Sequence, residues 1–483
     1  MATTSVHNTS MTTTPSRQIA DLPGPRGWPV LGNVLQLKPG LVHQSLERWA
    51  RQYGPFFKLR LGAHNALIVS DHAVTTAMLR ERPQQFRRPN RSRDVGLEMG
   101  FQTGVFSAEG EDWQRQRRMV MAGFSPSNVR AYFPSLLAVT QRLHKRWQQA
   151  AASGTSIALQ PDLMRFTVDA ISGLAFGIEV NTLESDDDII QQHLDKIFPA
   201  LQRRIFSIIP YWRFVRLPAD RALDRSAAAI QTAISEFIVQ ARARLQADPS
   251  RRENPPNLLE AMIVAADQAD SGLSDNDVAG NVRTMLLAGE DTTANTLAWM
   301  IYLLQQNPAC LARAREEVRR VAPDLATLTP EKMASLDYLE ACAQETMRLK
   351  PVAPTLPVEA NVDTVVGDIA VPRNTLVWNL LRVDTADDRY FPNAAQFQPE
   401  RWLEAAEQGN VATSQKRVSM PFGSGPRVCP GRYLALLEIK MAMAMLLGQF
   451  EIANVSTPDD QEAQELLSFT MSPVGLTMKL AQT

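Results

Sequence analysis

The sequence predicts one large, mainly α-helical domain that also contains small β-sheets, an α+β arrangement. The chain has 483 residues, 45% of them hydrophobic, which is enough to bury a large core. Apolar residues recur at spacings of three and four from about residue 115 to residue 350, which indicates helices. Length alone would allow about three domains of roughly 150 residues, but no Gly/Ser-rich or highly charged linker divides the chain. We therefore expect a single domain over residues 22–483.

The first 21 residues are expected to form a disordered lead. MATTSVHNTSMTTTPSRQIA is rich in Thr and Ser and has no apolar run that could be a signal peptide or a membrane span. Arg17 is its only arginine, whereas a transit peptide is rich in arginine. The Pro- and Gly-rich residues 22–33 exclude a regular helix and predict a turn-rich entry into the fold. We expect a soluble, cytoplasmic protein with no transmembrane anchor.

Two regions of the chain predict β-structure. Residues 56–61 and 66–69 are short alternating segments, typical of strands in a small sheet. Residues 358–378 include TVVGDIAVPRNTLVW, which has the β-branched residues and turn signals of a hairpin. The long stretches between these regions are rich in Ala, Leu, Gln and Arg, which favour helices.

Net charge and cysteine content exclude several classes of function. Fifty basic residues against 51 acidic residues give a formal net charge of −1, so no global field attracts nucleic acid. Cys310, Cys342 and Cys429 are far apart and form no CxxC pair, which argues against structural disulfides and a zinc site. A reducing cytosol fits this cysteine usage.

The most informative stretch is PFGSGPRVCPGRYLALLEIK, in which Cys429 stands among glycines and prolines ahead of an apolar segment. Gly423, Gly425 and Gly431 permit positive φ and the close approach of another group. The helical spacing after residue 434 places Cys429 at or just before a helix N-terminus, a position that favours a thiolate. From these residues alone, the thiolate could be a nucleophile, a redox thiol, a metal ligand or an ordinary buried cysteine.

The segment FGSGPRVCPG resembles the cysteine-ligand loop of the cytochrome P450 family, FGxGxRxCxG, at every fixed position. In that family the cysteine thiolate is the proximal ligand of haem iron, and it favours cleavage of the O–O bond of dioxygen. The resemblance implies that Cys429 ligates the iron of haem b (iron protoporphyrin IX). It also implies that Phe422, Gly423 and Gly431 form the loop around the cofactor. The expected fold is that of a cytochrome P450, with haem between this loop and the long central helix.

Residues 284–304, TMLLAGEDTTANTLAWMIYLL, predict part of that long helix. A capping box at Ser274 and Asp277 marks its start. Its centre is unusual, because Gly289 costs about 1 kcal/mol relative to alanine inside a helix. Asp291 lies in the same apolar segment, and a buried carboxylate requires a local distortion, a water molecule or a polar network.

AGEDTT resembles the oxygen-activation motif of the same family, in which an acid and an adjacent alcohol deliver protons to bound dioxygen. Asp291 and Thr292 match those positions and are therefore the implied catalytic residues. A short carboxylate–hydroxyl relay suits this task, because protons must reach a mostly dry pocket. The same motif implies that Ala288 lies beside the haem. The alternative is a polar patch on the surface of a helix.

Glu345 and Arg348 in ETMR stand three apart on a predicted helix that ends before Pro351. Alone this is a weak signal, since such pairs are common on solvated helix faces. Together with Arg401 in FQPERW, the pair resembles the Glu–Arg–Arg network that braces the cysteine loop in the family. We therefore assign these three residues a structural role.

EDWQRQRR places Trp113 and Arg117 four residues apart, like the WxxxR element that binds a haem propionate in the family. A forked guanidinium suits a carboxylate, so Arg117 and Arg427 are the expected propionate ligands. Val358 stands where many family members carry Arg or His, so another residue must supply that contact. Asn374 replaces the usual glycine of a turn, which its tolerance of the left-handed region allows.

The resemblance implies a soluble, bacterial-type haem-thiolate monooxygenase, which inserts one oxygen atom of O₂ into an apolar small molecule by hydroxylation or epoxidation. No GxGxxG fingerprint occurs, so electrons are expected from a separate ferredoxin or flavoprotein. The basic residues expected to contact that donor are Arg115, Arg118, Lys416 and Arg432. We expect a monomer. One alternative is a haem-thiolate peroxygenase or isomerase, and another is a non-enzymatic haem sensor or carrier; the acid–alcohol pair argues against both.

The substrate pocket is expected beside the long helix. Its candidate lining residues are Phe101, Phe106, Leu287, Thr355, Leu356 and Phe469. An apolar lining is usual for a ligand pocket, so it does not identify the substrate.

Overall fold

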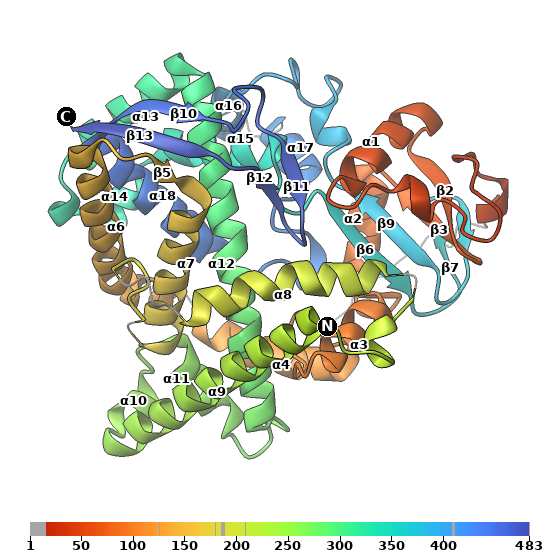
Figure 1. The fold of residues 1–483 in the computed structure, drawn as a ribbon, viewed down its shortest axis with the longest axis horizontal. Helices are drawn as coiled ribbons and strands as arrows, with labels where there is room; N and C mark the ends of the chain where they lie inside the picture. The colour runs from red at the N-terminus through yellow and green to blue at the C-terminus, as the bar shows by residue number, and fades with distance from the viewer. Residues whose placement is uncertain are drawn as a thin grey trace, which may run out of the picture.

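The computed structural model describes residues 16–124, 126–178, 180–184, 189–207, 209–407 and 411–482. Figure 1 shows the long helix α12 (Asp275–Gln306) passing through the middle of the molecule. Helices α6, α7 and α18 lie on one side of α12, and a β-rich region lies on the other. The predicted class, mainly helical with small sheets, is confirmed. No helix in the described part of the chain is long and apolar enough to span a bilayer.

The predicted capping box begins α12. The Ser274 hydroxyl accepts a hydrogen bond from the backbone N–H of Asp277, and the Asp277 carboxylate accepts one from the backbone N–H of Ser274. The helix continues without interruption through Gly289. A Cβ atom at Gly289 would lie 3.2 Å from Cγ1 of Ile171 on α7 (Leu159–Phe176). The glycine therefore allows α7 and α12 to pack closely.

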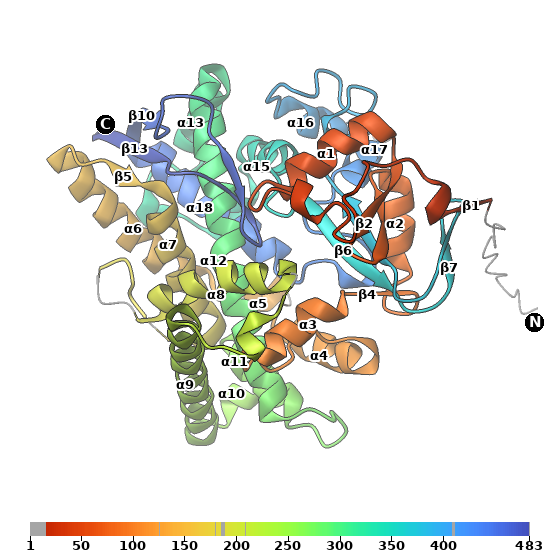
Figure 2. The same ribbon diagram turned by 45° about the vertical axis from the view of Figure 1, so that its right-hand side comes forward.

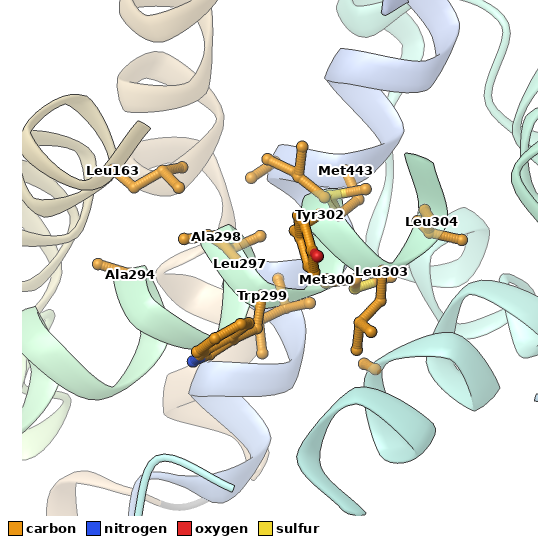
Figure 3. Close-up of a cluster of buried hydrophobic side chains, with 14 of the residues drawn as sticks. Leu163, Ala294, Leu297, Ala298, Trp299, Met300, Tyr302, Leu303, Leu304 and Met443 are labelled. Carbon is orange, nitrogen blue, oxygen red and sulfur yellow. The ribbon is translucent and has the colours of Figure 1, made fainter. Parts of the chain in front are cut away.

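Apolar side chains fix the C-terminal half of α12 between its neighbours. Figure 3 shows residues of α12 packed with Leu163 of α7 and Met443 of α18 (Arg432–Gln449). Trp299 and Leu297 of α12 are fully buried, and each such side chain contributes roughly 1.5–3 kcal/mol to folding. Because α18 directly follows the cysteine loop, this packing fixes the loop relative to α12.

The β-rich region is a five-stranded sheet with the order β2-β3-β9-β6-β4. Its strands are β2 (Phe56–Leu61), β3 (His64–Val69), β9 (Leu376–Leu380), β6 (Thr355–Ala360) and β4 (Phe86–Arg87). β3 pairs with β9 in parallel, and the other neighbours are antiparallel. β7 (Thr364–Val366) and β8 (Ile369–Val371) form a hairpin with Gly367 at a φ of 62°. Both predicted β-regions are confirmed, and Asn374 adopts the expected left-handed conformation with a φ of 66°.

Ordered structure begins earlier in the chain than residue 22. β1 (Arg17–Gln18) pairs in parallel with β8, and Nε of Arg17 donates a 2.9 Å hydrogen bond to the carboxylate of Asp368. Ile19 is buried against the same region. Residues 16–21, which we placed in the disordered lead, are therefore part of the fold, because they complete a sheet edge. Residues 1–15 lie outside the described part of the chain.

Figures 1 and 2 both show α8 passing across α12, and α9 packs against α8. The other described helices are α1 (Val42–Tyr53), α2 (His72–Arg80), α3 (Asn90–Glu98), α4 (Gly110–Gly123), α5 (Pro126–Ala131), α6 (Phe133–Ser153), α8 (Ile189–Phe206), α9 (Pro218–Ala247), α10 (Ser250–Glu253), α11 (Leu258–Ala266), α13 (Pro308–Val321), α14 (Pro330–Ala334), α15 (Asp337–Leu349), α16 (Glu400–Glu407) and α17 (Val411–Val418). The remaining strands are β5 (Ile157–Ala158), β10 (Phe450–Ser456), β11 (Glu465–Leu467), β12 (Met471–Pro473) and β13 (Thr477–Gln482).

The structure joins Glu345, Arg348 and Arg401 in one buried network. Arg348 donates hydrogen bonds of 2.8 and 2.7 Å to the two carboxylate oxygens of Glu345, and Nε of Arg401 donates one of 3.0 Å. Arg348 also donates to the backbone carbonyl oxygens of Thr385, Ala394 and Gln396. These contacts hold the segment 385–402 against α15. Since each buried charge has partners, the network supports a structural role.

Candidate active site

Backbone geometry closes the cysteine loop. The backbone N–H of Cys429 donates a 2.9 Å hydrogen bond to the carbonyl oxygen of Phe422. Gly423 and Gly425 have φ values of 76° and 73°, in the left-handed region that favours glycine. A Cβ atom at Gly425 would lie only 2.3 Å from the carbonyl oxygen of Leu79, so a larger residue does not fit there. The loop glycines therefore serve the turn and a close backbone approach, as the sequence predicts.

Gly431 differs from that expectation. It is the N-cap of α18 with a φ of −83°, so it does not need positive φ. Its backbone N–H instead donates to the sulfur of Cys429 and lowers the pKa of that thiol. Gly431 thus contributes a hydrogen bond to the cysteine.

Burial raises the pKa of the Cys429 thiol, while the Gly431 N–H, Arg117 and Arg432 lower it. Burial therefore opposes the thiolate that we expect from the helix N-terminus, and that thiolate stays a prediction. The Cys429 residue nevertheless has exposed surface. Metal coordination deprotonates a thiol, and the same three groups would then stabilise the anion. The donor set fits a haem-iron ligand.

Four arginines near the loop face too few carboxylates. Arg82 is 2% exposed, and Arg88 and Arg427 lie close enough to it for mutual repulsion. Burial lowers the pKa of Arg82, lowers that of Arg88 well below its usual range and lowers that of Arg427 to about 10. Arg117 adds a fourth positive charge. Glu109 interacts with Arg82, Arg88 and Arg427.

Several buried nitrogen donors of this arginine cluster also indicate that it binds additional anions. Nε and one terminal nitrogen of Arg82, and Nε of Arg427, are buried without a hydrogen-bond partner among the described residues. Buried cations with free donors require additional anions. The cluster therefore fits the two propionate carboxylates of haem. The Arg427 guanidinium also lies 4.7 Å above the ring of Trp113, which is buried as a haem-side residue would be.

The structure provides candidates for the propionate contact absent at position 358. Val358 is fully buried in β6 and pairs with Val377, so it lies in the sheet core. Arg82 and Arg88 occupy the cluster instead. Sequence reasoning missed both residues and Glu109, because they precede the WxxxR element in segments without a family motif.

A polar network surrounds the acid on α12. Nδ2 of Asn295 donates a 2.8 Å hydrogen bond to Oδ1 of Asp291, and the Thr470 hydroxyl donates to Oδ2. The Thr292 hydroxyl donates a 2.8 Å bond to the carbonyl oxygen of Ala288. Of the three arrangements considered for a buried Asp291, the network is therefore present, and the helix stays continuous. Asn295 and Thr470 were not identified from the sequence.

A second buried acid connects the two helices that flank the site. Glu438 on α18 is 3% exposed, and burial raises its pKa to about 8 against a hydrogen bond from Thr293 on α12. At neutral pH this carboxyl group is mostly protonated. Sequence reasoning missed Glu438, because the family loop motif ends at residue 431.

A cavity of about 120 Å³ lies beside α12. The predicted residues among its lining are Phe101, Phe106, Leu287, Ala288 and Phe469. Thr355 and Leu356 do not line it; they lie in β6, where Leu356 packs against the core of the β-rich region. Sheet pairing therefore holds these two residues elsewhere.

Cationic side chains also line the cavity. Arg88, Arg93 and Arg283 contribute to its wall, whereas no Asp or Glu in the described part of the chain does. Arg283 on α12 is 4% exposed and donates 2.7 Å hydrogen bonds to the side-chain and backbone oxygens of Gln102. Burial lowers the pKa of Arg283 to about 10, so it remains charged at neutral pH. The cavity is apolar with a positively charged section.

Comparisons with known proteins agree with this site. A family model described as Cytochrome P450 matches residues 22–480. CYP505U2 of Exserohilum turcicum, a self-sufficient cytochrome P450 monooxygenase, is 29% identical over 477 residues, covering 96% of this chain and 42% of that protein. CYP505E5 of Aspergillus niger, which carries the same description, is 28% identical over 473 residues, covering 95% of this chain and 43% of that protein. The chain spans about two fifths of the length of these curated relatives.

A solved structure shows the same fold. The crystal structure of a mutant cytochrome P450DA haem domain aligns with a TM-score of 0.81 and 26% identity, covering 96% of this chain and 98% of that chain.

Replacing one arginine of the cluster tests the propionate assignment. In Arg82→Met, haem should leave the protein faster, by about tenfold or more if a charged hydrogen bond is lost. The haem-free variant should be at least as stable as wild type, because repulsion with Arg88 and Arg427 is reduced. Haem transfer to a scavenger protein and thermal unfolding measure the two effects. Arg80→Met, at an exposed position on α2, is the control, and equal haem loss in both variants would contradict the assignment.

The raised pKa of Glu438 predicts a pH-dependent stability. Between about pH 4.5 and 8 the folded state keeps a proton that the unfolded state releases. The unfolding free energy therefore falls as pH rises through this window, by up to about 1.4 kcal/mol per unit. Glu438→Gln lacks this loss, so its stability relative to wild type should increase with pH and level off above about pH 8. A difference in melting temperature that does not change with pH, as expected for the exposed control Glu462→Gln, would oppose this interpretation.

Proposed function

The chain belongs to the cytochrome P450 family, and on that premise we propose that it is a haem-thiolate monooxygenase of apolar small molecules. The proposed reaction inserts one oxygen atom of O₂ into the substrate, by hydroxylation or epoxidation. The proposal is carried by the presence of an exposed Cys429 in the loop together with a buried Asp291 and the adjacent, partly buried Thr292 on α12. A peroxygenase, an isomerase or a haem carrier would leave this acid–alcohol pair without a task.

One group of site residues would bind the cofactor, and a second group would deliver protons. When bound, haem supplies the iron that binds and activates dioxygen. Cys429 would hold that iron, and the Gly431 N–H, Arg117 and Arg432 would stabilise its negative sulfur. The Thr292 hydroxyl on α12 would deliver a proton into the site. Asp291, one residue away, would replace that proton with one taken from solvent water.

The electron source is a further part of the proposal. We favour a separate ferredoxin or flavoprotein that contacts Arg115, Arg118, Lys416 and Arg432, of which the last three are exposed. A complementary acidic surface on the donor would speed the encounter of the two proteins. The named relatives are self-sufficient cytochrome P450 monooxygenases with longer chains than this one.

The cavity supports a substrate that has an apolar body and an acidic group. Phe101, Leu287 and Phe469 provide apolar contact area, while Arg283 provides a buried positive charge without a carboxylate partner among the lining residues. Arg283 precedes Thr292 by nine residues, which is roughly 13 Å along the helix axis. An acid bound at Arg283 would therefore leave the distant end of the molecule beside the catalytic pair.

Turnover with isotopically labelled dioxygen tests the proposed reaction. Product should carry the label when NAD(P)H and a ferredoxin with its reductase are added, and the purified chain with NAD(P)H alone should form none. Thr292→Ala should keep haem but divert electrons to hydrogen peroxide, since proton delivery is impaired. Thr292→Ser retains the hydroxyl and is the control. Unchanged coupling in Thr292→Ala, or full turnover with hydrogen peroxide and no electron donor, would refute the assignment.

Two probes of equal chain length test the acidic-substrate proposal. Dodecanoic acid should bind wild type more tightly than 1-dodecanol does, as measured by the change in the haem absorption spectrum. Arg283→Met should weaken binding of the acid by about tenfold or more, because a charged hydrogen bond is lost, while binding of the alcohol changes little. Arg93→Met, whose side chain is 43% exposed, should have a smaller effect. Equal weakening of both probes would indicate only a packing role for Arg283.

A further inference from the structure

One turn of the chain touches both the cavity and the catalytic acid. Phe469 and Thr470 lie between β11 and β12. The Phe469 side chain lines the cavity, where its ring centroid is 5.9 Å from that of Phe106. The hydroxyl of the next residue, Thr470, donates a hydrogen bond to Oδ2 of Asp291. Adjacent residues of the turn therefore contact the substrate space and the proton relay.

The network holds the Asp291 carboxylate at both oxygens. Oδ1 accepts from Nδ2 of Asn295, and Oδ2 accepts from Thr470. Nε2 of Gln160 donates a 3.0 Å bond to Oδ1 of Asn295, which fixes the orientation of that amide. Asn295 is fully buried and Thr470 is 5% exposed. To pass a proton to Thr292, Asp291 must give up at least one of these contacts.

The turn is strained and is held from outside. Phe469 has a φ of 105°, a conformation that an aromatic residue rarely adopts. The Ser468 N–H donates a 2.9 Å bond to the carbonyl oxygen of Thr470 across the turn. Nε2 of Gln202 on α8 donates a 2.7 Å bond to the carbonyl oxygen of Leu467, just before it. Strain held by a few contacts is a means by which a ligand can change a conformation.

We propose that Thr470 is a positioning residue that holds Asp291 inactive until a substrate packs against Phe469. Contact with the substrate lets the turn relax, and the Thr470 hydroxyl then moves away from Oδ2 of Asp291. Only when the cavity is filled is Oδ2 of Asp291 free to take up a proton from solvent water and pass it on through Thr292. This inference rests on the proposed monooxygenase function. It links substrate binding to oxygen activation and limits wasteful reduction of dioxygen by the empty enzyme.

A single-turnover experiment without substrate tests whether the hydrogen bond from Thr470 holds Asp291 inactive. The haem-loaded full chain is reduced photochemically by one electron and mixed with air-saturated buffer. One electron passes to dioxygen, and a proton delivered at the site lets the reduced oxygen leave as the hydroperoxyl radical. The return of the oxidised absorption spectrum should be several-fold faster in Thr470→Val than in wild type, with a larger solvent isotope effect. Thr470→Ser keeps the hydroxyl and should behave as wild type.

Two further variants separate release of Asp291 from general damage to the hairpin. Asp291→Asn combined with Thr470→Val should remove the acceleration, which a merely loosened structure would keep. Phe469→Gly adopts the same positive φ without strain, so it removes the driving force for relaxation and should leave the slow rate of wild type unchanged. Equal rates in wild type and Thr470→Val, or a rate in Phe469→Gly as fast as that of Thr470→Val, would overturn the proposal.

Toluene serves as the apolar probe of the cavity. It should accelerate the reaction of wild type towards that of Thr470→Val and leave the variant unchanged. A wild-type rate that toluene does not alter would contradict the link between cavity and acid. The reduced carbon monoxide spectrum is recorded for every variant. A thiolate-type spectrum with unaltered rates defeats this inference alone, whereas its absence from wild type defeats the proposed function.

Discussion

The fixed position of Cys429 in its closed loop is the constraint on which the rest of the site depends. Burial raises the pKa of the Cys429 thiol, and a bound metal cation would favour the deprotonated sulfur. The loop supports that state with the Gly431 N–H and is itself fixed by the bond from Cys429 to Phe422. The packing of α18 against α12 then carries this fixed position to the catalytic pair.

The cost of burying a charge also explains the excess of positive charge in the arginine cluster near the loop. Arg82, Arg88 and Arg427 repel one another around Glu109, and they become favourable only when further carboxylates join them. Glu438 responds to burial in the opposite way. Burial raises its pKa, so the carboxyl group is mostly neutral and can donate or accept a hydrogen bond. Asp291 is a third case, in which neighbouring polar side chains occupy both oxygens.

The sequence predicts the features of the fold and site that depend on local periodicity or on a known motif. The helical class, both β-regions, the α12 capping box and the residues of the Glu345 network follow from periodicity or motif, because their partners are near in sequence or belong to a known constellation. The partners of the site come from distant segments without motifs. Thr470 lies 179 residues from Asp291, and Arg427 lies 318 residues from Glu109. The effect of burial on the pKa of the Cys429 thiol is likewise absent from the sequence pattern, because burial arises from tertiary packing and not from a position before a helix.

The central claim is that Cys429 binds haem iron through its sulfur. The absorption spectrum of the reduced protein with carbon monoxide tests it most directly, with Cys429→Ser for comparison. The account predicts a strongly red-shifted Soret band in freshly prepared wild type and its loss in the variant. Absence of haem, or a band typical of a neutral ligand in wild type, would contradict the account.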